Sequence, residues 1–398
     1  MTIPTGAADC WYEISNVGEI PSPALAFYPE RIEENIREMI RIAGDPGRLR
    51  PHVKTHKTAE IVKLQMRLGI RRFKCSTIAE AEMAAACGAS DVLLAMQPVG
   101  PAVARFFALK RKFPATSLSA IVDSEAVIDE LARAAAGAGM EASVWIDVNS
   151  GMNRTGIAPG AEAIRLYTLV HARAGLRIGG LHVYDGHIHE SDLAARTTIC
   201  DGEFAPVQAM IDDLRTAGLP VPAVVAGGSP TFPIHARRPG VELSPGTPLL
   251  WDAGYSAAYP DLDFLVAAVL VTRVVSRPGE RPAGVRTRSR GGTQAAHAGP
   301  DAVSRVCLDL GTKALASEMP QPRVSLLGVE TYQIVAHNEE HFVIETPDAG
   351  RYHPGDVVYG IPAHICPTVA RYESASVVEQ GRCTGEWQIA ARNRRITV

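Results

Sequence analysis

The sequence predicts a (β/α)8 TIM barrel followed by a mostly-β domain. Between about residues 50 and 250, eight short apolar runs alternate with longer segments of helical periodicity. This number and order of strands and helices is what a (β/α)8 barrel requires. After about residue 265, β-type runs follow one another with little helix between them. The length of 398 residues exceeds one ordinary domain and is enough for two.

Each predicted barrel strand is a short apolar run. In chain order the runs are PHVKT (51–55), RRFKCST (71–77), DVLLAM (91–96), SLSAIVDS (117–124), ASVWIDV (142–148), IGGLHVY (178–184), PAVVAGG (222–228) and GVELSP (240–245). A doubly wound open sheet is the alternative. That fold needs fewer strands and usually carries a GxGxxG turn after the first one, which this sequence lacks.

Helices are predicted between the early strands. They span 58–69, 78–89, 100–113, 125–139 and 159–175. Polar residues that favour N-caps begin three of them, and glycines that favour helix ends close the same three. The caps are Thr58, Thr77 and Ser124, and the glycines are Gly69, Gly88 and Gly139.

We expect the barrel to occupy residues 20–265. The β-rich domain would comprise residues 266–398 together with residues 1–19. The early run ALAFYP (24–29) precedes the barrel and is expected to pair with it. Residues 276–304 are rich in Gly, Pro, Arg and Ala without periodicity, which predicts a mobile insert.

Composition excludes several classes of protein. The net charge of -3 gives no basic field for nucleic acid or an anionic membrane. No apolar run reaches 18 residues, and the N-terminus lacks the pattern of a secretion signal. The seven cysteines are scattered without a CxxC pair, which is typical of a reducing compartment. We therefore expect a cytoplasmic enzyme with a small-molecule substrate.

The run RPHVKTHK (50–57) carries two lysines and two histidines. On a strand, alternation places His52, Lys54 and His56 on one face, and Lys57 falls in the following turn, where we expect it to be solvated. Lys54 would then stand at the barrel mouth, where TIM barrels place their chemistry. A partly desolvated amine there is a nucleophile suited to a Schiff base. A lysine held in a salt bridge at a strand end is the alternative.

Four later turns follow predicted strands. SGMNRTG (150–156) carries Arg154, and LHVYDGHIHE (181–190) carries three histidines, a tyrosine and two acids. AGGSPT (226–231) and ELSPGT (242–247) are small-residue turns whose backbone N–H groups suit a phosphate. With a lysine on the first strand, this pattern predicts a site for pyridoxal phosphate.

These motifs resemble those of the fold type III pyridoxal-phosphate enzymes, the alanine-racemase-like barrels. Within that group, RPHVKTHK and the late HICPT (364–368) resemble the D-threonine aldolase and D-serine dehydratase family. The resemblance covers about residues 20–390, except the 276–304 insert. It implies a lyase that acts on D-amino acids and a homodimer with the active site at the subunit interface.

The resemblance also implies roles for individual residues. Lys54 would hold pyridoxal 5'-phosphate, with His52 beside it. Arg154 would contact the phenolic oxygen side of the cofactor, and Tyr184 would lie at the pyridine nitrogen. Four residues would hold the phosphate: Gly228, Ser229, Gly246 and Thr247. Ser244 stands where alanine racemases have an arginine, and this neutral partner disfavours racemisation.

The motif PAHICPT (362–368) adds a metal site. His364 and Cys366 are two residues apart, so on a strand both side chains point the same way. Imidazole and thiolate are ligands that suit Zn²⁺. The resemblance identifies this position with a divalent metal, Zn or Mn, that acts on the substrate hydroxyl.

Two lyase reactions fit these residues. A D-threonine aldolase would cleave a D-β-hydroxy-α-amino acid to glycine and an aldehyde, with His189 as the base on the hydroxyl, although the family register falls on Glu190. A D-serine dehydratase would release a 2-oxo acid and ammonia. A racemase and a non-catalytic pyridoxal-phosphate-binding protein are further alternatives, and metal dependence separates the lyases from the racemase.

Overall fold

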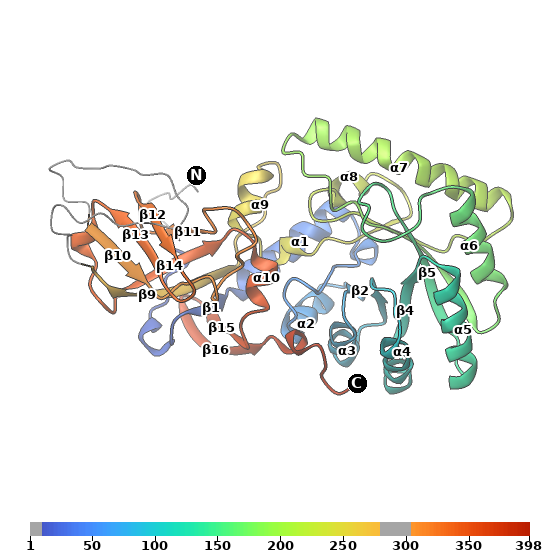
Figure 1. Cartoon of the computed structure of the whole chain (residues 1–398), viewed down its shortest axis with the longest axis horizontal. Helices are drawn as coiled ribbons and strands as arrows, with labels where there is room; N and C mark the ends of the chain where they lie inside the picture. Colours follow the sequence, from blue (N-terminus) through green and yellow to red (C-terminus); the bar gives the residue numbers. More distant parts are fainter. Residues whose placement is uncertain (1–9, 279–303) are drawn as a thin grey trace.

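The computed structural model describes residues 10–278 and 304–398. A barrel wrapped by helices lies beside a β-rich domain, and the two are distinct along the long axis of the molecule (Figure 1). This arrangement confirms the predicted fold class.

Seven parallel strands form the curved sheet of the barrel, in chain order from β2 to β8. They are β2 (Arg72–Cys75), β3 (Asp91–Leu94), β4 (Ser117–Val122), β5 (Ala142–Val148), β6 (Leu176–Val183), β7 (Val224–Ala226) and β8 (Val241–Leu243). Each overlaps one of the predicted apolar runs. The strands are almost wholly buried, as expected for a parallel sheet that is covered on both faces.

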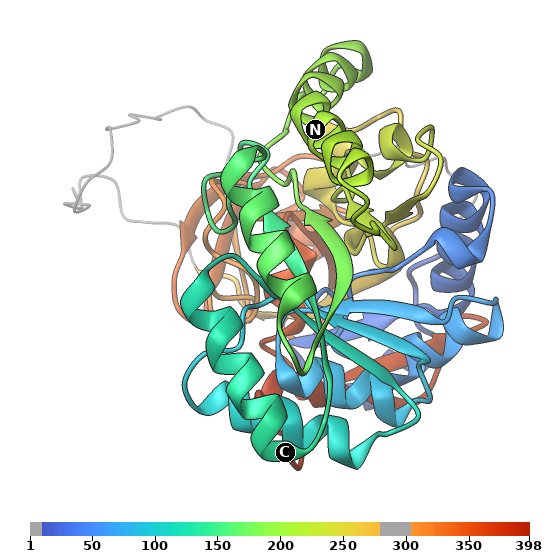
Figure 2. The same cartoon turned by 90° about the vertical axis from the view of Figure 1, so that its right-hand side faces the viewer.

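Helices cover the outside of this sheet (Figure 2). The helices of this part of the chain are α1 (Pro29–Ala43), α2 (Ala59–Arg67), α3 (Ile78–Ala86), α4 (Pro101–Lys112), α5 (Glu125–Ala138), α6 (Ala161–Ala172), α7 (Leu193–Thr216) and α8 (Phe232–His235), and the short α9 (Ala253–Ala258) lies toward the second domain. The five predicted helices are α2 to α6. At the start of α3 the Thr77 side chain accepts the Glu80 N–H. Gly139 ends α5 at a φ of 63°, a conformation that favours glycine.

The predicted first strand is shorter than expected. Residues 49–53 lie between β8 and β2 and bridge to both in parallel, so they occupy the eighth position of the barrel. The Arg50 N–H donates to a β8 carbonyl, and the Val53 N–H donates to a β2 carbonyl. Pairing stops at Val53 because the Lys57 N–H donates back to the Val53 carbonyl at 2.9 Å, which closes a turn. Lys54 therefore sits in this turn and not on a strand.

The second domain is built on a nine-stranded sheet. Besides β1 (Ala24–Phe27), its strands are β9 (Ala268–Ser276), β10 (Ser304–Leu308), β11 (Val324–Leu327), β12 (Gln333–His337), β13 (Phe342–Thr346), β14 (Val357–Pro362), β15 (Ser374–Glu379) and β16 (Arg382–Gln388). The short helix α10 (Ile365–Val369) follows β14. Central strand β9 pairs with β1, β10 and β14.

The early strand β1 belongs to this second sheet. It pairs antiparallel with β9 and parallel with β15. The expectation that residues 24–29 pair with the barrel is therefore wrong. The apolar sequence of β1 does not by itself reveal with which of the two sheets the strand will pair.

Most of the predicted mobile insert lies outside the described residues, which omit 279–303. At its edges, Ser276 ends β9 and Ser304 begins β10. Within the described ranges, none of the helices combines the length and apolarity needed to cross a membrane.

Arg50 ties the first barrel segment to its neighbours. Its side chain is 1% exposed. It donates to both carboxylate oxygens of Asp91, at 2.7 and 3.0 Å, and to Glu242 at 2.6 Å. Asp91 begins β3 and Glu242 lies in β8, so one guanidinium connects three parts of the barrel.

We expect Arg50→Met to destabilise the protein by about 3–5 kcal/mol, because it leaves the partly buried Asp91 without its cation and leaves Glu242 paired with Arg72 alone. Urea denaturation followed by circular dichroism measures the change. Arg37→Met is the matched control, since Arg37 pairs with Glu33 on an exposed helix face and such pairs contribute less than about 1 kcal/mol. Equal midpoints for the two variants would contradict the role given to Arg50.

Candidate functional site

Lys54 lies at the barrel mouth, half-buried in the turn that follows residues 49–53. Its Nζ is 5.5 Å from the centre of the Tyr184 ring. It forms no ion pair with any described residue, so it is not the salt-bridged lysine that the sequence left as an alternative. His52 is buried beneath it and accepts the Lys54 backbone N–H on Nδ1 at 3.3 Å. Burial, and then the charge of Lys54, holds the pKa of His52 well below its usual value.

Lys57 is not solvated as the sequence suggested. Its ammonium pairs with the carboxylate of Glu80, whose side chain is fully buried in α3. A positive φ of 53° turns Lys57 toward that helix. The two lysines of the motif therefore differ, since Lys57 is neutralised by a partner and Lys54 is not.

Three cationic side chains surround one aromatic ring. Lys54, Lys74 and Arg154 lie 5.5, 5.3 and 4.8 Å from the centre of the Tyr184 ring. Across the described part of the chain, none of the three is in an ion pair. Cation–π contacts offset only part of the mutual repulsion of three charges, so this place attracts an anion.

The two small-residue turns meet beside this ring. The backbone N–H groups of Gly246 and Thr247 both point to the Ser229 Oγ, at 3.3 and 3.2 Å. A Cβ on Gly246 would lie only 3.0 Å from the His52 carbonyl oxygen, so a larger residue would fit there only if the neighbouring backbone shifted. Ser244 lies two residues before Gly246, and its hydroxyl donates to the Arg50 carbonyl at 2.9 Å.

Gly228 lies under Tyr184, because a Cβ on it would be 3.3 Å from the tyrosine ring. Its N–H is already engaged, donating to Asp185 Oδ1 at 3.0 Å. Asp185 also accepts from Thr231 Oγ1 at 2.8 Å and contacts His235 Nε2 at 2.8 Å. This carboxylate thus braces the turn that carries Ser229.

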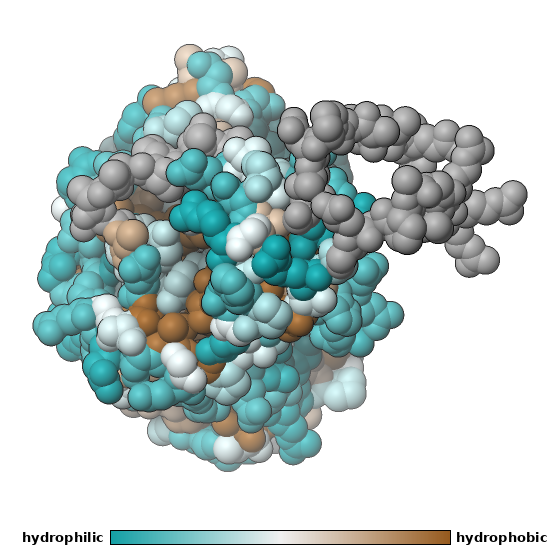
Figure 3. Space-filling model, turned by 90° about the vertical axis from the view of Figure 1, so that its left-hand side faces the viewer, coloured by the Kyte–Doolittle hydropathy of each residue, from teal (hydrophilic) through white to brown (hydrophobic). Residues whose placement is uncertain are grey.

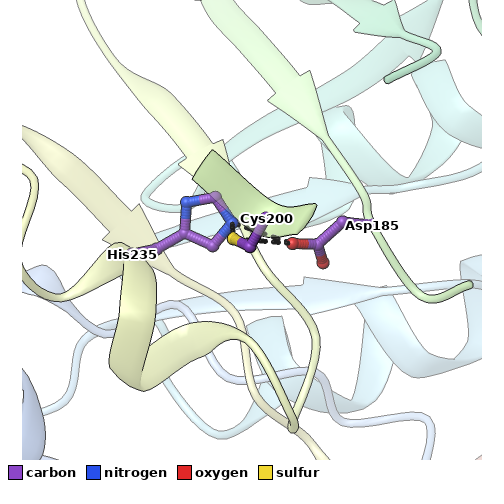
Figure 4. Close-up of side chains that lie close together, drawn as sticks. All are labelled: Asp185, Cys200 and His235. Atoms are coloured by element: carbon purple, nitrogen blue, oxygen red, sulfur yellow. Dashed lines mark hydrogen bonds and ion pairs between the residues drawn. The ribbon is translucent and has the colours of Figure 1, made fainter. Parts of the chain in front are cut away.

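Asp185, Cys200 and His235 form a buried cluster (Figure 4). Their potential ligand atoms lie within 4.8 Å of one another, a donor set that could hold a metal. Arg238, however, donates to His235 Nδ1 at 3.0 Å, so the ring hydrogen sits on Nε2 and points to Asp185. A metal-binding histidine has the opposite arrangement, with its second nitrogen donating to an acceptor. The hydrogen bonds therefore favour a structural role for this cluster over metal binding.

The HxC motif reaches the barrel from the second domain. His364 is the N-cap of α10 and Cys366 lies in its first turn, so the expected strand is wrong here. Buried Asp252 holds this helix start, accepting the Ile365 N–H at 3.0 Å. The Cys366 Sγ lies 3.2 Å from Thr55 Oγ1 and 3.6 Å from Thr247 Oγ1. The motif therefore meets both the Lys54 turn and the Ser229 cradle.

His364 and Cys366 shift each other's pKa in opposite directions. Burial lowers the pKa of His364, but Cys366 and the Glu318 carboxylate outweigh it and raise that pKa to about 9. Burial raises the pKa of the Cys366 thiol, but hydrogen bonding to His364 outweighs it and lowers that pKa overall. Glu318 lies 2.6 Å from His364 Nδ1, which leaves Nε2 as the nitrogen for a metal.

The predicted base, His189, does not lie at the barrel mouth. His189 is exposed, and Glu190 beside it is half-buried. The neighbouring His187 contacts Glu203 at 2.8 Å on α7. The structure thus brings Lys54, His52, Arg154, Tyr184, Ser229, Gly246, Thr247, His364 and Cys366 to one mouth, while His189 faces outward.

Sequence reasoning missed a group on the barrel interior. Asp147 of β5 and His182 of β6 are register partners, and His182 Nδ1 lies 2.7 Å from Asp147 Oδ1. Lys74 of β2 lies 3.5 Å from His182 Nε2. Polar residues inside otherwise apolar runs were the available signal, but the sequence did not show that they face one another.

Two family models cover the chain. The alanine racemase N-terminal domain matches residues 29–249, and a putative serine dehydratase domain matches residues 267–378. Their junction coincides with the change from barrel to β-rich domain.

Relatives span nearly the whole chain at low identity. D-threonine aldolase of Arthrobacter sp. is 27% identical over 383 residues, covering 94% of each chain. D-threo-3-hydroxyaspartate dehydratase of Delftia sp. (strain HT23) is 27% identical over 390 residues, covering 93% of this chain and 97% of the relative. 3-Hydroxy-D-aspartate aldolase of Paracoccus denitrificans is 27% identical over 388 residues, covering 94% of this chain and 93% of the relative.

The fold also matches solved structures. The crystal structure of D-threonine aldolase from Filomicrobium marinum superposes with a TM-score of 0.81 at 25% identity, covering 95% of this chain and 97% of that one. Because the alanine racemase N-terminal domain accounts for more than half of its length, the chain belongs to that family, in a form joined to a serine-dehydratase-type β domain.

Proposed function

We propose that this protein is a pyridoxal-phosphate- and divalent-metal-dependent lyase of D-β-hydroxy-α-amino acids, of the D-threonine aldolase type. The observation that carries this proposal is the contact between Cys366 and Thr55, which brings the HxC motif of the β domain next to the Lys54 turn. A simple racemase has no use for an imidazole–thiolate pair at that place.

The residues at the barrel mouth fit pyridoxal 5'-phosphate. Three cations without ion-pair partners among the described residues surround Tyr184, which suits a cofactor that carries several negative charges. Ser229, Gly246 and Thr247 would hold its phosphate, and Gly246 keeps the backbone there close to His52. Lys54 would anchor it covalently. When bound, pyridoxal phosphate withdraws electrons from the α-carbon of the amino acid.

The motif at 364–366 fits a divalent metal, Zn or Mn. The Cys366 thiol is readily ionised, and the Glu318 carboxylate orients His364 in the way that metal-bound histidines are held. Thr55 and Thr247 flank the site with hydroxyls. A metal held there supplies Lewis acidity toward a substrate hydroxyl.

Side chains of the protein itself would carry out proton transfer, fix the Lys54 turn and orient the substrate. Lys54 has no acidic partner among the described residues, so its amine is free to give and take protons once a substrate has replaced it. His52 stays neutral and holds the Lys54 backbone, which fixes the turn. Arg154 lies over Tyr184 at the exposed rim, where it can orient an anionic group of the substrate.

A D-serine-dehydratase-type reaction is the second candidate. The exposed position of His189 favours it, because the aldolase reading needs a base on the β-hydroxyl. Dehydration requires only that the α-proton be removed and the hydroxyl carried away, which Lys54 and the metal site suffice to do. The dehydratase relative is as similar as the aldolases.

We also propose a homodimer with the active site at the subunit interface. The loop after β3, at the mouth of the barrel, exposes Met96 and Val99, at 55% and 52%. On the face of the β-rich domain seen in Figure 3, an apolar patch is surrounded by hydrophilic surface. Exposed apolar surface of this kind is typical of an interface.

Product analysis tests the reaction. We expect D-threonine, incubated with protein loaded with pyridoxal phosphate and Zn²⁺ or Mn²⁺, to give glycine and acetaldehyde in the proton NMR spectrum. D-threo-3-Hydroxyaspartate should be tested in parallel, because two kinds of relative are named for hydroxyaspartates. 2-Oxo acid and ammonia would establish the dehydratase instead. The lyase proposal would be overturned if neither substrate gave the aldolase products or the dehydratase products.

Lys54→Ala is the control for that experiment. It should yield no product and lose the visible absorbance of lysine-linked pyridoxal phosphate. Lys57→Ala removes the other lysine of the motif, which pairs with Glu80, and should keep the absorbance. Retained absorbance in Lys54→Ala would show that a different lysine anchors the cofactor.

Metal removal tests the HxC site. We expect chelation to abolish turnover and Zn²⁺ or Mn²⁺ to restore it, while bound pyridoxal phosphate is retained. Cys366→Ala should lose both metal and activity. Glu318→Ala should weaken metal binding by about 10- to 100-fold, because it removes the acceptor that orients His364. Cys307→Ala, in strand β10, is the matched cysteine control. Full activity of chelated protein would remove the metal from the proposal.

Light scattering tests the dimer. The loaded protein should have twice the 42.5 kDa mass of one chain. Val99→Asp should reduce the measured mass, because it places a charge in the apolar loop at the mouth. Ile396→Asp changes a similarly exposed apolar residue near the C-terminus and should not. A single-chain mass for the unmodified protein would exclude the dimer.

A further inference from the structure

Lys74 is a buried lysine that the proposed reaction has not used. It lies in β2 with a side chain that is only 2% exposed, facing the barrel interior. It is the bridge partner of His52, so it sits directly beside the segment that carries Lys54. The chain has seven lysines, which makes two in one barrel mouth unusual.

The neighbours of Lys74 form a relay. Its Nζ is 3.5 Å from His182 Nε2, and His182 Nδ1 is 2.7 Å from Asp147 Oδ1. Because Asp147 accepts the Nδ1 hydrogen, Nε2 presents its lone pair to the lysine. His182 is 3% exposed and Asp147 is 4% exposed. An amine, a neutral imidazole and a carboxylate therefore follow one another out of contact with water.

Charges on every side act on this amine. Lys54 in the first barrel segment and Arg154 in the loop after β5 repel its positive charge, and His52 would do so if protonated. Asp147 in β5 and Asp185 after β6 attract it. Burial is the largest effect, followed by Lys54, and together they lower the pKa of Lys74 to about 7. Burial also lowers the pKa of His182, which keeps the ring neutral, with the Nε2 lone pair available to the amine.

A purely structural lysine would have a carboxylate partner. Burial of an unpaired ammonium is costly, and buried lysines are normally paired. Among the described residues, Lys74 has no ion pair, and its Nζ faces the same Tyr184 ring as Lys54. The protein therefore retains a buried amine whose charged form is costly, at a place where the amine can gain and lose a proton.

We propose that Lys74 is a second functional lysine of this site, which exchanges a proton with the cofactor and substrate bound at Lys54 and shares it with His182 and Asp147. The step is a proton transfer alone. An N–H bond forms at Nζ as the bond between hydrogen and the donor atom breaks, and the reverse step restores both. No oxidant or further reactant is consumed. The kinetic part of this inference rests on the proposed lyase function.

The first test observes the amine itself. Protein labelled with ¹³C at lysine Cε and loaded with pyridoxal phosphate is titrated by NMR, and Lys74→Arg assigns the signal. We expect the Lys74 signal to titrate near pH 7, whereas an exposed lysine titrates at about pH 10. Asp147→Asn should shift the Lys74 midpoint. A Lys74 signal that titrates with the exposed lysines would overturn the proposal.

The second test uses the cofactor absorbance. Lys74→Met fills the same space without a charge, so it should fold and keep bound pyridoxal phosphate. We expect the midpoint of the absorbance change near pH 7, where Lys74 of the unmodified protein gains its positive charge beside the cofactor, to move by a unit or more, or the change to disappear. Lys110→Met, which alters a half-buried lysine on α4, is the control and should not move it. An unchanged midpoint in Lys74→Met would place the amine away from the cofactor.

The third test is kinetic. Lys74→Met and Lys74→Arg should both lower kcat by about 100-fold or more, as loss of an acid–base group does. Arginine keeps the charge but does not release its proton, so rescue by Lys74→Arg would show a merely electrostatic role and overturn the proposal. If the unmodified protein releases no lyase product, the proposed function fails, while the NMR and absorbance experiments still decide the role of Lys74.

Discussion

The ion pairs of Arg50 are the constraint on which the geometry of the site depends. Residues 49–53 have only a short backbone pairing with β8 and β2, too little to fix a strand by itself. The guanidinium compensates by binding carboxylates of β3 and β8 in the barrel wall. Because the segment ends in the turn that carries Lys54, the position of the reactive amine follows from an interaction at the opposite end of the segment.

The site is assembled from both domains, and electrostatics explains why it holds together. The barrel contributes cations around Tyr184 that have no ion-pair partner among the described residues, and the β domain contributes the Cys366 thiol, whose pKa is lowered by His364. Asp252, buried just after the barrel strands, fixes the helix start that carries that thiolate. Two histidines show how hydrogen bonding assigns roles. His364 faces a carboxylate and is suited to a metal, whereas His235 faces Arg238 and is not.

Much of this arrangement could be predicted from the sequence, because periodicity identifies strands and helices and the Lys54 motif lies at a strand end. Other parts depended on partners remote in sequence. Lys57 looked solvated because Glu80, which neutralises it, lies in the next helix unit. Lys74 looked like a polar interruption of an apolar run, and only the closed barrel brings it to His182. The pairing of β1 depended on strands of the second domain that form far later in the chain.

The position of β1 also has a consequence for how the chain is made. This strand leaves the ribosome before the barrel, yet its two partners, β9 and β15, are synthesised about 240 and 350 residues later. The barrel between them can form from neighbouring units as they emerge. Strand β1 must wait for β9 until the barrel has been synthesised, and for β15 until most of the β-rich domain has followed. Completing the second sheet thus joins segments from before and after the barrel, and in doing so it delivers Cys366 to the turn of Lys54.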